Sequence, residues 1–363
     1  MTFRGRLVSA LWIPVAAIAA LAFVPPETAL LSSYAIRWYA VALVLAAVMG
    51  RTRRWAAISA AGLSMAGGLA VALKFAGLLL TRSDFMFTTL VVGGLVVAIL
   101  GGLQLVRLLR ADKPGDPVVI AAVQIGIGLV ANWAYFAPAL FRLDPRNYPT
   151  ETWATPFRNE LPVLALALAA VGLGVSRSWR PALERLGVTL PAWWQPFLAV
   201  LVASLFLIAE PIANHLTFLL TPRLYFAIAA ISNFTFGNAD LRVEMLFAVM
   251  AGVCEETLFR GALQPRAGIV VTALLFAMIH TQYFATPIVA VIFGHGLIYG
   301  LLRSRINTTT AIMAHASYDL IGYFSMGKVG YAVIALLMVA VLAVPAIKHR
   351  RAIWTSLGPP VRA

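Results

Sequence analysis

Three ionisable residues in a strongly apolar stretch are the first candidates for chemistry in this sequence. Glu255, Glu256 and Arg260 lie inside the apolar run 243–263. Charges at membrane depth are costly, so they are usually kept for a function or for a partner. Glu256 and Arg260 are four residues apart, which places an acid and a base on one helix face. Glu255 is rotated by about 100° from Glu256, so we expect it to be the free carboxylate that faces a polar cavity and handles water.

The same residues also fit a purely structural role, because a buried charge network can lock helices together without catalysis. Residues further along the chain favour chemistry. His280 lies in the next apolar segment, and His315 and Asp319 are four apart in a later one. One carboxylate and two imidazoles would then come from three helices of a bundle, and helical bundles build their interior sites in this way.

In these three stretches the sequence resembles the CAAX prenyl proteases and bacteriocin-processing enzymes, also called the Abi or type II CAAX endopeptidase family. The motifs of that family are Glu-Glu-x-x-x-Arg, Phe-x-x-x-His and His-x-x-x-Asn or Asp. They read here as Glu255, Glu256 and Arg260, then Phe276 and His280, then His315 and Asp319. All three occur in the family's order on successive apolar segments, within 241–324.

The resemblance implies an intramembrane endopeptidase in which Glu255 is the general base and His280 its partner in activating a water. A carboxylate in a poorly solvated site and a neighbouring imidazole suit this task physically. Glu256 and Arg260 would position the pair.

The third motif would supply hydrogen-bond donors to the tetrahedral oxyanion, which His315 could do directly. Asp319 stands where many family members have Asn. An ionised Asp offers no donor, so we expect Asp319 to orient His315 instead.

A metal site is the main alternative for these groups. Glu255, His280 and His315 could form a two-His, one-carboxylate zinc site with an open water position. The sequence lacks a His-Glu-x-x-His helix, the usual zinc-protease signature, so we predict no cofactor and keep zinc as the alternative. Cys254, the single cysteine, is interpreted as a small packing residue rather than a nucleophile. His295 is interpreted as an interior, packed histidine.

The composition places these residues in a membrane. Of the 363 residues, 61% are apolar and 12% are charged, whereas soluble domains carry about 25% charged residues. We therefore predict an all-α polytopic membrane protein, a helical bundle with an intramembrane polar cavity. The net charge of +14 does not indicate a nucleic-acid partner, because Lys and Arg cluster between apolar segments, as the positive-inside rule expects. The Ala- and Arg-rich composition is typical of a bacterial protein.

Stretches of about 20 apolar residues predict about twelve transmembrane helices. The charge bias of the loops places both termini in the cytoplasm and the chain in the cell (inner) membrane, as a multi-pass protein. The predicted spans are 7–24, 36–50, 55–80, 85–106, 118–141, 161–176, 197–220, 243–263, 269–283, 287–302, 308–324 and 330–347.

Three regions follow from these spans. Residues 1–190 are predicted to be an accessory transmembrane region of about six helices, 191–350 the catalytic bundle and 351–363 a cytoplasmic tail. The boundary lies at the amphipathic stretch 177–194, whose Trp193 and Trp194 are typical of anchors at the level of the lipid headgroups. Residues 142–160 are predicted to be an outer loop. The pairs Gly67-Gly68 and Gly93-Gly94 indicate close helix contacts.

The leading functional hypothesis is a protease that cleaves a membrane-associated peptide or protein tail, with the lipid bilayer as its other partner. Eukaryotic members of the resembled family remove a tripeptide after a prenylated cysteine. The bacterial character favours a leader peptide, a sorting tail or an anchored segment instead. Two alternatives remain: a non-catalytic scaffold or immunity protein of the same fold, and a proton-coupled transporter that uses Glu255 and the histidines as a relay. No oligomeric state follows from the sequence.

Overall fold

A computed structural model describes residues 29–79, 85–109, 152–236, 240–280, 283, 286–324 and 327–348. The regular secondary structure in this described part is helical, as predicted. The predicted spans 7–24 and 118–141 and the predicted tail 351–363 lie outside it. The chain forms two compact units, 1–139 with 172–176, and 140–171 with 177–363. The boundary between these units lies earlier in the chain than the predicted boundary at residue 190. The accessory role of residues 1–190 and the catalytic role of residues 191–350 stay predictions.

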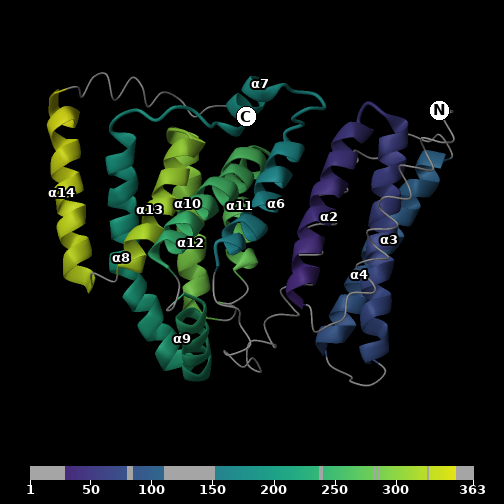
Figure 1. The fold of residues 1–363 in the computed structure, drawn as a ribbon, viewed down its shortest axis with the longest axis horizontal. Helices are drawn as coiled ribbons and strands as arrows, with labels where there is room; N and C mark the ends of the chain where they lie inside the picture. The colour runs from purple at the N-terminus through teal and green to yellow at the C-terminus, as the bar shows by residue number, and fades with distance from the viewer. Residues whose placement is uncertain are drawn as a thin grey trace. The chain divides into compact units, whose positions relative to one another are not determined.

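The first unit contains three described helices, α2, α3 and α4, of which α3 packs against both of the others (Figure 1). Glycines let α3 and α4 approach closely, because a Cβ at Gly94 would lie 2.7 Å from the backbone nitrogen of Ala72 and equally close to the carbonyl of Gly68. The predicted close contact of these glycines is therefore confirmed. The helices are α2 Ala29–Gly50, α3 Arg54–Leu79 and α4 Phe85–Leu109.

The second unit is a helical bundle in which α8 packs against α9, α12, α13 and α14. The short helix α7 lies across one end of this bundle and α9 lies at the opposite end (Figure 1). The helices are α6 Ala154–Ala170, α7 Trp179–Leu186, α8 Gln195–Leu220, α9 Pro222–Phe236, α10 Leu241–Glu256, the π-helix η3 Thr257–Leu263, α11 Gln264–Ile279, α12 Pro287–Arg305, α13 Thr308–Tyr323 and α14 Gly327–Lys348.

Four helical stretches in the described residues are long and apolar enough to cross a membrane: Arg54–Leu73, Gln195–Leu220, Leu241–Ile279 and Pro287–Arg305. Three shorter apolar helices accompany them, Arg37–Gly50, Val91–Arg107 and Gly327–Ala343. The chain is thus a helical membrane protein, and the predicted number of twelve crossings is not confirmed. The stretch Leu241–Ile279 has 39 residues, about twice the length that one crossing needs.

The structure corrects several predicted boundaries. The predicted outer loop 142–160 is already helical from Ala154, and α6 ends at Ala170 rather than at 176. Helix α9 was missed, because its 15 residues begin with Pro222 and Arg223 and polar residues interrupt its apolar run toward the end. The predicted span 269–283 begins just after a break in the backbone, since Gly268 has a φ of 78°, but the helix ends at Ile279 rather than at 283.

Glycine also sets the contact between α10 and α13, the two helices that carry the first and third motifs. A Cβ at Gly252 would lie 2.9 Å from the backbone nitrogen of Ala316 and 2.9 Å from the carbonyl oxygen of Ile312. These are backbone atoms, which cannot rotate away, so only glycine allows this approach. The close contact brings the end of α10 beside the middle of α13.

We expect Gly252→Val to lower the thermal unfolding temperature in detergent and to impair any activity of the site, because the added methyl groups push α10 from α13. Overpacking of this kind costs about 1–3 kcal/mol. Gly294→Ala is the matched control, since nothing lies within 4 Å of a Cβ at that position. Equal unfolding temperatures for the two variants would contradict this account of the helix contact.

Candidate active site

The paired charges of the first motif lie at a change of helix type. Glu256 is the last residue of α10, and Arg260 lies in the π-helix that follows it. Arg260 Nε lies 3.0 Å from Glu256 Oε2, and neither side chain is exposed to solvent. The N–H is not aligned for a hydrogen bond, so the contact is an ion pair. The predicted pairing is present, although the segment was expected to be a regular α-helix; π-helices are rare and often mark functional sites.

Aromatic rings surround the rest of the Arg260 guanidinium group. Its Cζ lies 4.5 Å from the centroid of the Phe276 ring, 5.8 Å from that of Phe259 and 5.6 Å from that of Tyr299. The two Nη atoms are buried and have no hydrogen-bond partner. The positive charge of Arg260 is therefore stabilised by cation–π contacts in addition to the carboxylate of Glu256. Phe276, the aromatic residue of the second motif, is in this way tied to the first motif.

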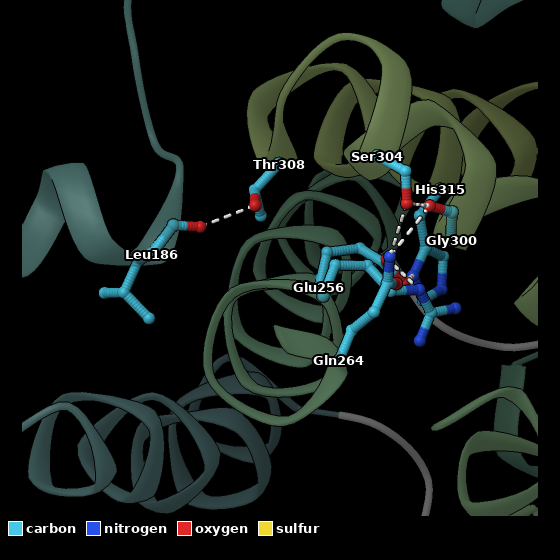
Figure 2. A network of polar contacts seen from close by, with 8 residues as sticks. Leu186, Glu256, Gln264, Gly300, Ser304, Thr308 and His315 are labelled. Carbon is cyan, nitrogen blue, oxygen red and sulfur yellow. Dashed lines mark hydrogen bonds and ion pairs between the residues drawn. The ribbon is translucent and has the colours of Figure 1, made fainter. Parts of the chain in front are cut away.

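His315 links the first motif to the third. Its Nδ1 lies 3.0 Å from Glu256 Oε1, so Glu256 pairs with Arg260 through one oxygen and accepts from His315 through the other. On the opposite side of the ring, His315 Nε2 lies 3.6 Å from Asp319 Oδ2, which is too long for a hydrogen bond. Figure 2 shows Glu256 and His315 converging from their two helices. The sequence pattern did not reveal the Glu256–His315 contact.

His280 lies at the C-terminal cap of α11 rather than within the helix. Its Nδ1 lies 2.8 Å from the carbonyl oxygen of Phe276. A carbonyl oxygen only accepts, so Nδ1 carries a proton in this contact and the lone pair of a neutral ring is on Nε2. The ring centroid is 4.9 Å from that of Phe276. The backbone contact fixes the ring in the tautomer that can accept a proton at Nε2.

Glu255 is the carboxylate of the first motif that takes no part in the ion pair of Glu256 and Arg260. It is half-buried, and its buried Oε2 has no hydrogen-bond partner. Its charge interacts electrostatically with His280, His315 and Asp319. The structure therefore gathers the residues of all three motifs around one carboxylate with an unused acceptor oxygen. An unpaired buried oxygen costs free energy, and a water or a substrate group would offset that cost.

Tyr299 belongs to this site but lies outside the three motifs. Its ring stacks on that of His315, with centroids 5.4 Å apart and 17° between the planes. The residue is 1% exposed, and its hydroxyl has no hydrogen-bond partner. The signal for it in the sequence is the Gly296-x-x-x-Gly300 spacing, because two glycines at this spacing indicate a close helix contact.

The close contact of α11 and α12 holds Tyr299 in place. A Cβ at Gly296 would lie 2.9 Å from Cα of Ala273, which belongs to α11. Gln264 Nε2 donates to the carbonyl oxygen of Gly300 at 2.9 Å and contacts Oγ of Ser304 at 3.0 Å. Figure 2 shows this bridge beside Glu256 and His315. The polar network thus fixes the turn of α12 that follows Tyr299.

The alternative zinc site does not fit the geometry. In the part of the chain that the structure describes, no three His, Cys, Asp or Glu side chains are arranged to hold a metal ion. His315 Nδ1 lies 3.0 Å from Glu256 and Nε2 lies 3.6 Å from Asp319, so the ring is oriented toward these two carboxylates rather than in a ligand set with Glu255 and His280. The expectation that no cofactor is needed stays a prediction.

Packing explains the positions of Cys254 and His295, and hydrogen bonds explain that of Glu210, another carboxylate in an apolar helix. Cys254 is buried and 2% exposed. His295 is 5% exposed and its ring lies 3.9 Å from that of Phe206, centroid to centroid. Glu210 in α8 accepts from Tyr318 at 3.1 Å and from Asn214 at 3.3 Å. None of these three residues is tied to the charge network around Arg260 by a hydrogen bond or ion pair that the described residues show.

Comparison with known families agrees with the motifs. Residues 237–321 match the family model described as type II CAAX prenyl endopeptidase Rce1-like. The match covers α10, η3, α11, α12 and all of α13 except its C-terminal end. No curated protein and no solved structure is significantly similar to the chain. The matched segment contains Glu255, Glu256, Arg260, His280 and the third-motif pair.

Proposed function

We propose, on the premise that residues 237–321 belong to the Rce1-like type II CAAX prenyl endopeptidase family, that this chain is a membrane-embedded endopeptidase. The observation that carries the proposal is the unpartnered, buried oxygen of Glu255, within electrostatic range of two histidines that belong to the other two motifs. A general base needs an acceptor oxygen that no protein donor occupies.

In the proposed reaction, Glu255 accepts a proton from a water while the water oxygen attacks the peptide carbonyl carbon. His280, held through Nδ1 on Phe276, hydrogen-bonds the water through Nε2. The proton passes to the amine nitrogen when the C–N bond breaks, which leaves a carboxylic acid and an amine; the acid then gives its proton to the amine, so that the products are a carboxylate and an ammonium group. Glu256 and Arg260 fix the ends of α10 and η3, and through Glu256 they also fix His315. His315 and Asp319 assist the oxyanion, Asp319 by orienting the ring.

The proposed substrates are peptides or protein tails that reach the bilayer, because the site lies on membrane-spanning helices. We place the chain in the cell membrane with both termini in the cytoplasm, as the loop charges predict. No nucleic acid or cofactor takes part in the proposed reaction.

The proposal is tested with the purified full-length chain in liposomes that carry membrane-anchored peptides, with and without a C-terminal prenylated cysteine. Cleavage in H₂¹⁸O should produce fragments whose new carboxyl group contains ¹⁸O, read by mass spectrometry. Chelators and the substitution Cys254→Ala should leave the yield unchanged. Absence of fragments from every peptide would favour a non-catalytic scaffold, and peptide-independent proton uptake by the liposomes would favour a transporter.

Asp319→Asn should keep the cleavage rate within about tenfold of wild type, a change below about 1.4 kcal/mol in the barrier. An amide keeps a polar group 3.6 Å from His315 Nε2 and adds a donor for the oxyanion. Asp319→Leu removes the polar group beside His315 and adds no donor, so it should slow cleavage further. If Asp319→Asn abolishes cleavage in a folded protein, the orienting role of this residue is wrong.

A further inference from the structure

The C-terminal end of α7 is fixed to the first turn of α13. Gly187 caps α7 with a φ of 69°. Thr308 donates its Oγ1–H to the carbonyl of Leu186 at 2.6 Å and its backbone N–H to the carbonyl of Gly187 at 2.9 Å. Figure 2 shows the first of these contacts. Thr309 adds two bonds to the backbone of Thr189, at 2.9 and 2.7 Å. The junction therefore uses the carbonyl groups that end α7.

Two arginines, Arg185 and Arg303, lie close together at this junction. A Cβ at Gly187 would lie 2.6 Å from Cζ of Arg303, so the guanidinium group lies flat against the glycine. Arg303 Nε is buried and has no hydrogen-bond partner. Arg303 interacts electrostatically with Arg185 of α7, and burial and the nearby Arg177 lower the pKa of Arg185.

Among the described residues no carboxylate pairs with either guanidinium group. The acid beside them in the sequence, Glu184, lies 3.2 Å from Arg180 instead and its side chain is 64% exposed. The carbonyl oxygens of Leu186 and Gly187 already accept from Thr308. Two partly buried cations with unused donors and no counter-charge are unfavourable, and an external anion would remove the repulsion.

The surroundings of the junction indicate where that anion comes from. Trp179 and Trp193 are 57% and 59% exposed, and Leu190 between them is 95% exposed. Exposed Trp side chains beside apolar helices are typical of the level of the lipid headgroups. Arginine presents planar, paired donors that match phosphate oxygens. A lipid phosphate is thus the anion that this depth supplies.

We propose that Arg185 and Arg303 form a binding site for the phosphate group of an anionic membrane lipid, at the junction of α7 and α13. The guanidinium of Arg303, held against Gly187, presents its unused N–H groups to the phosphate, and Arg185 supplies the second charge. The site lies outside the charge network around Arg260 and is independent of the proposed hydrolysis. A bound lipid would hold α7 against the bundle through both arginines.

The test uses the full-length chain in nanodiscs of phosphatidylcholine to which phosphatidylglycerol is added, with lipid binding read by native mass spectrometry. Wild type should retain phosphatidylglycerol, and Arg303→Gln and Arg185→Gln should each bind it about tenfold or more weakly. Arg305→Gln is the matched control, since Arg305 lies exposed at the end of the same helix. It should bind as wild type does.

Equal weakening by Arg303→Gln and Arg305→Gln would overturn the site in favour of general surface attraction. A second arm adds inorganic phosphate to the nanodiscs that contain phosphatidylglycerol and, separately, to nanodiscs of phosphatidylcholine alone. Displacement of phosphatidylglycerol only at high phosphate concentration supports a lipid site, whereas tight binding of phosphate alone would overturn the lipid as its source. If Arg303→Gln does not fold, Arg303→Lys replaces it in the experiment. Lysine keeps the positive charge but lacks the planar, paired donors of the guanidinium group. Wild-type binding of phosphatidylglycerol by Arg303→Lys would contradict the proposal.

Discussion

Glu255→Gln is expected to lower the rate of peptide cleavage by about 10²- to 10⁴-fold, the usual contribution of a general base. The amide is nearly the same size as the carboxylate but cannot take a proton from water. The fold should persist, because Glu255 Oε2 has no hydrogen-bond partner to lose and the neighbouring ion pair of Glu256 and Arg260 is untouched. Loss of rate with an unchanged unfolding temperature would identify Glu255 as the base.

Glu210→Gln provides the matched comparison for this experiment. Glu210 is also a carboxylate within a membrane-spanning helix, but both of its oxygens accept from protein donors, Tyr318 and Asn214. We expect this variant to cleave at close to the wild-type rate. The measurement is the initial rate of fragment formation for the three proteins in the same liposomes. Wild-type cleavage by Glu255→Gln would remove Glu255 from the mechanism.

Glu256→Met is expected to cost about 3–5 kcal/mol of stability, the price of leaving a buried charge without its partner. Arg260 is fully buried, and Glu256 is the carboxylate that forms an ion pair with it among the described residues. His315 would lose the acceptor of its Nδ1 in the same step. The double substitution Glu256→Met with Arg260→Met should recover most of this loss, because apolar replacement of a whole buried pair is often neutral or stabilising.

Equilibrium unfolding in mixed detergent micelles measures the two variants against wild type. The control is Glu184→Met, which breaks the ion pair with Arg180 at the same spacing of four residues on an exposed surface. It should change stability by less than about 1 kcal/mol. If the double variant is no more stable than Glu256→Met alone, the cost does not come from an unpaired guanidinium group.

Local spacing was enough to predict part of the site. The spacing of four residues between Glu256 and Arg260 predicted their contact, and the pair is present at 3.0 Å. The spacing of His315 and Asp319 likewise placed both groups on one face of α13. These predictions succeeded because they depend on helix geometry over a single turn. The family resemblance was confirmed by the match over 237–321.

Contacts between helices could not be predicted from spacing. The bond from His315 to Glu256 depends on how closely α10 approaches α13, which Gly252 sets through backbone atoms of the other helix. Tyr299 was missed for the same reason, since its place on His315 depends on the packing of α12 on α11. A sequence pattern reports the face of a helix, but not the partner that the face will meet.

Helix boundaries failed where the hydrophobicity signal was weak or continuous. Residues 222–236 form α9 although polar residues interrupt the end of their apolar run. The run Leu241–Ile279 has a high mean hydropathy, so hydropathy could not locate the change to a π-helix at Thr257. The gap between the predicted spans 243–263 and 269–283 does include the break at Gly268. Backbone geometry of this kind depends on tertiary packing more than on residue type.

The wide turn Thr257–Leu263 makes the site depend on the number of residues as well as on their kinds. A π-helix contains more residues per turn than an α-helix. If these same residues closed into an ordinary α-helix with none removed, everything after them would rotate by about 100° around the axis. Phe276 would leave its place above Arg260, and His280 would leave with it. The number of residues between the first two motifs therefore determines where the side chains of the second motif lie relative to Arg260.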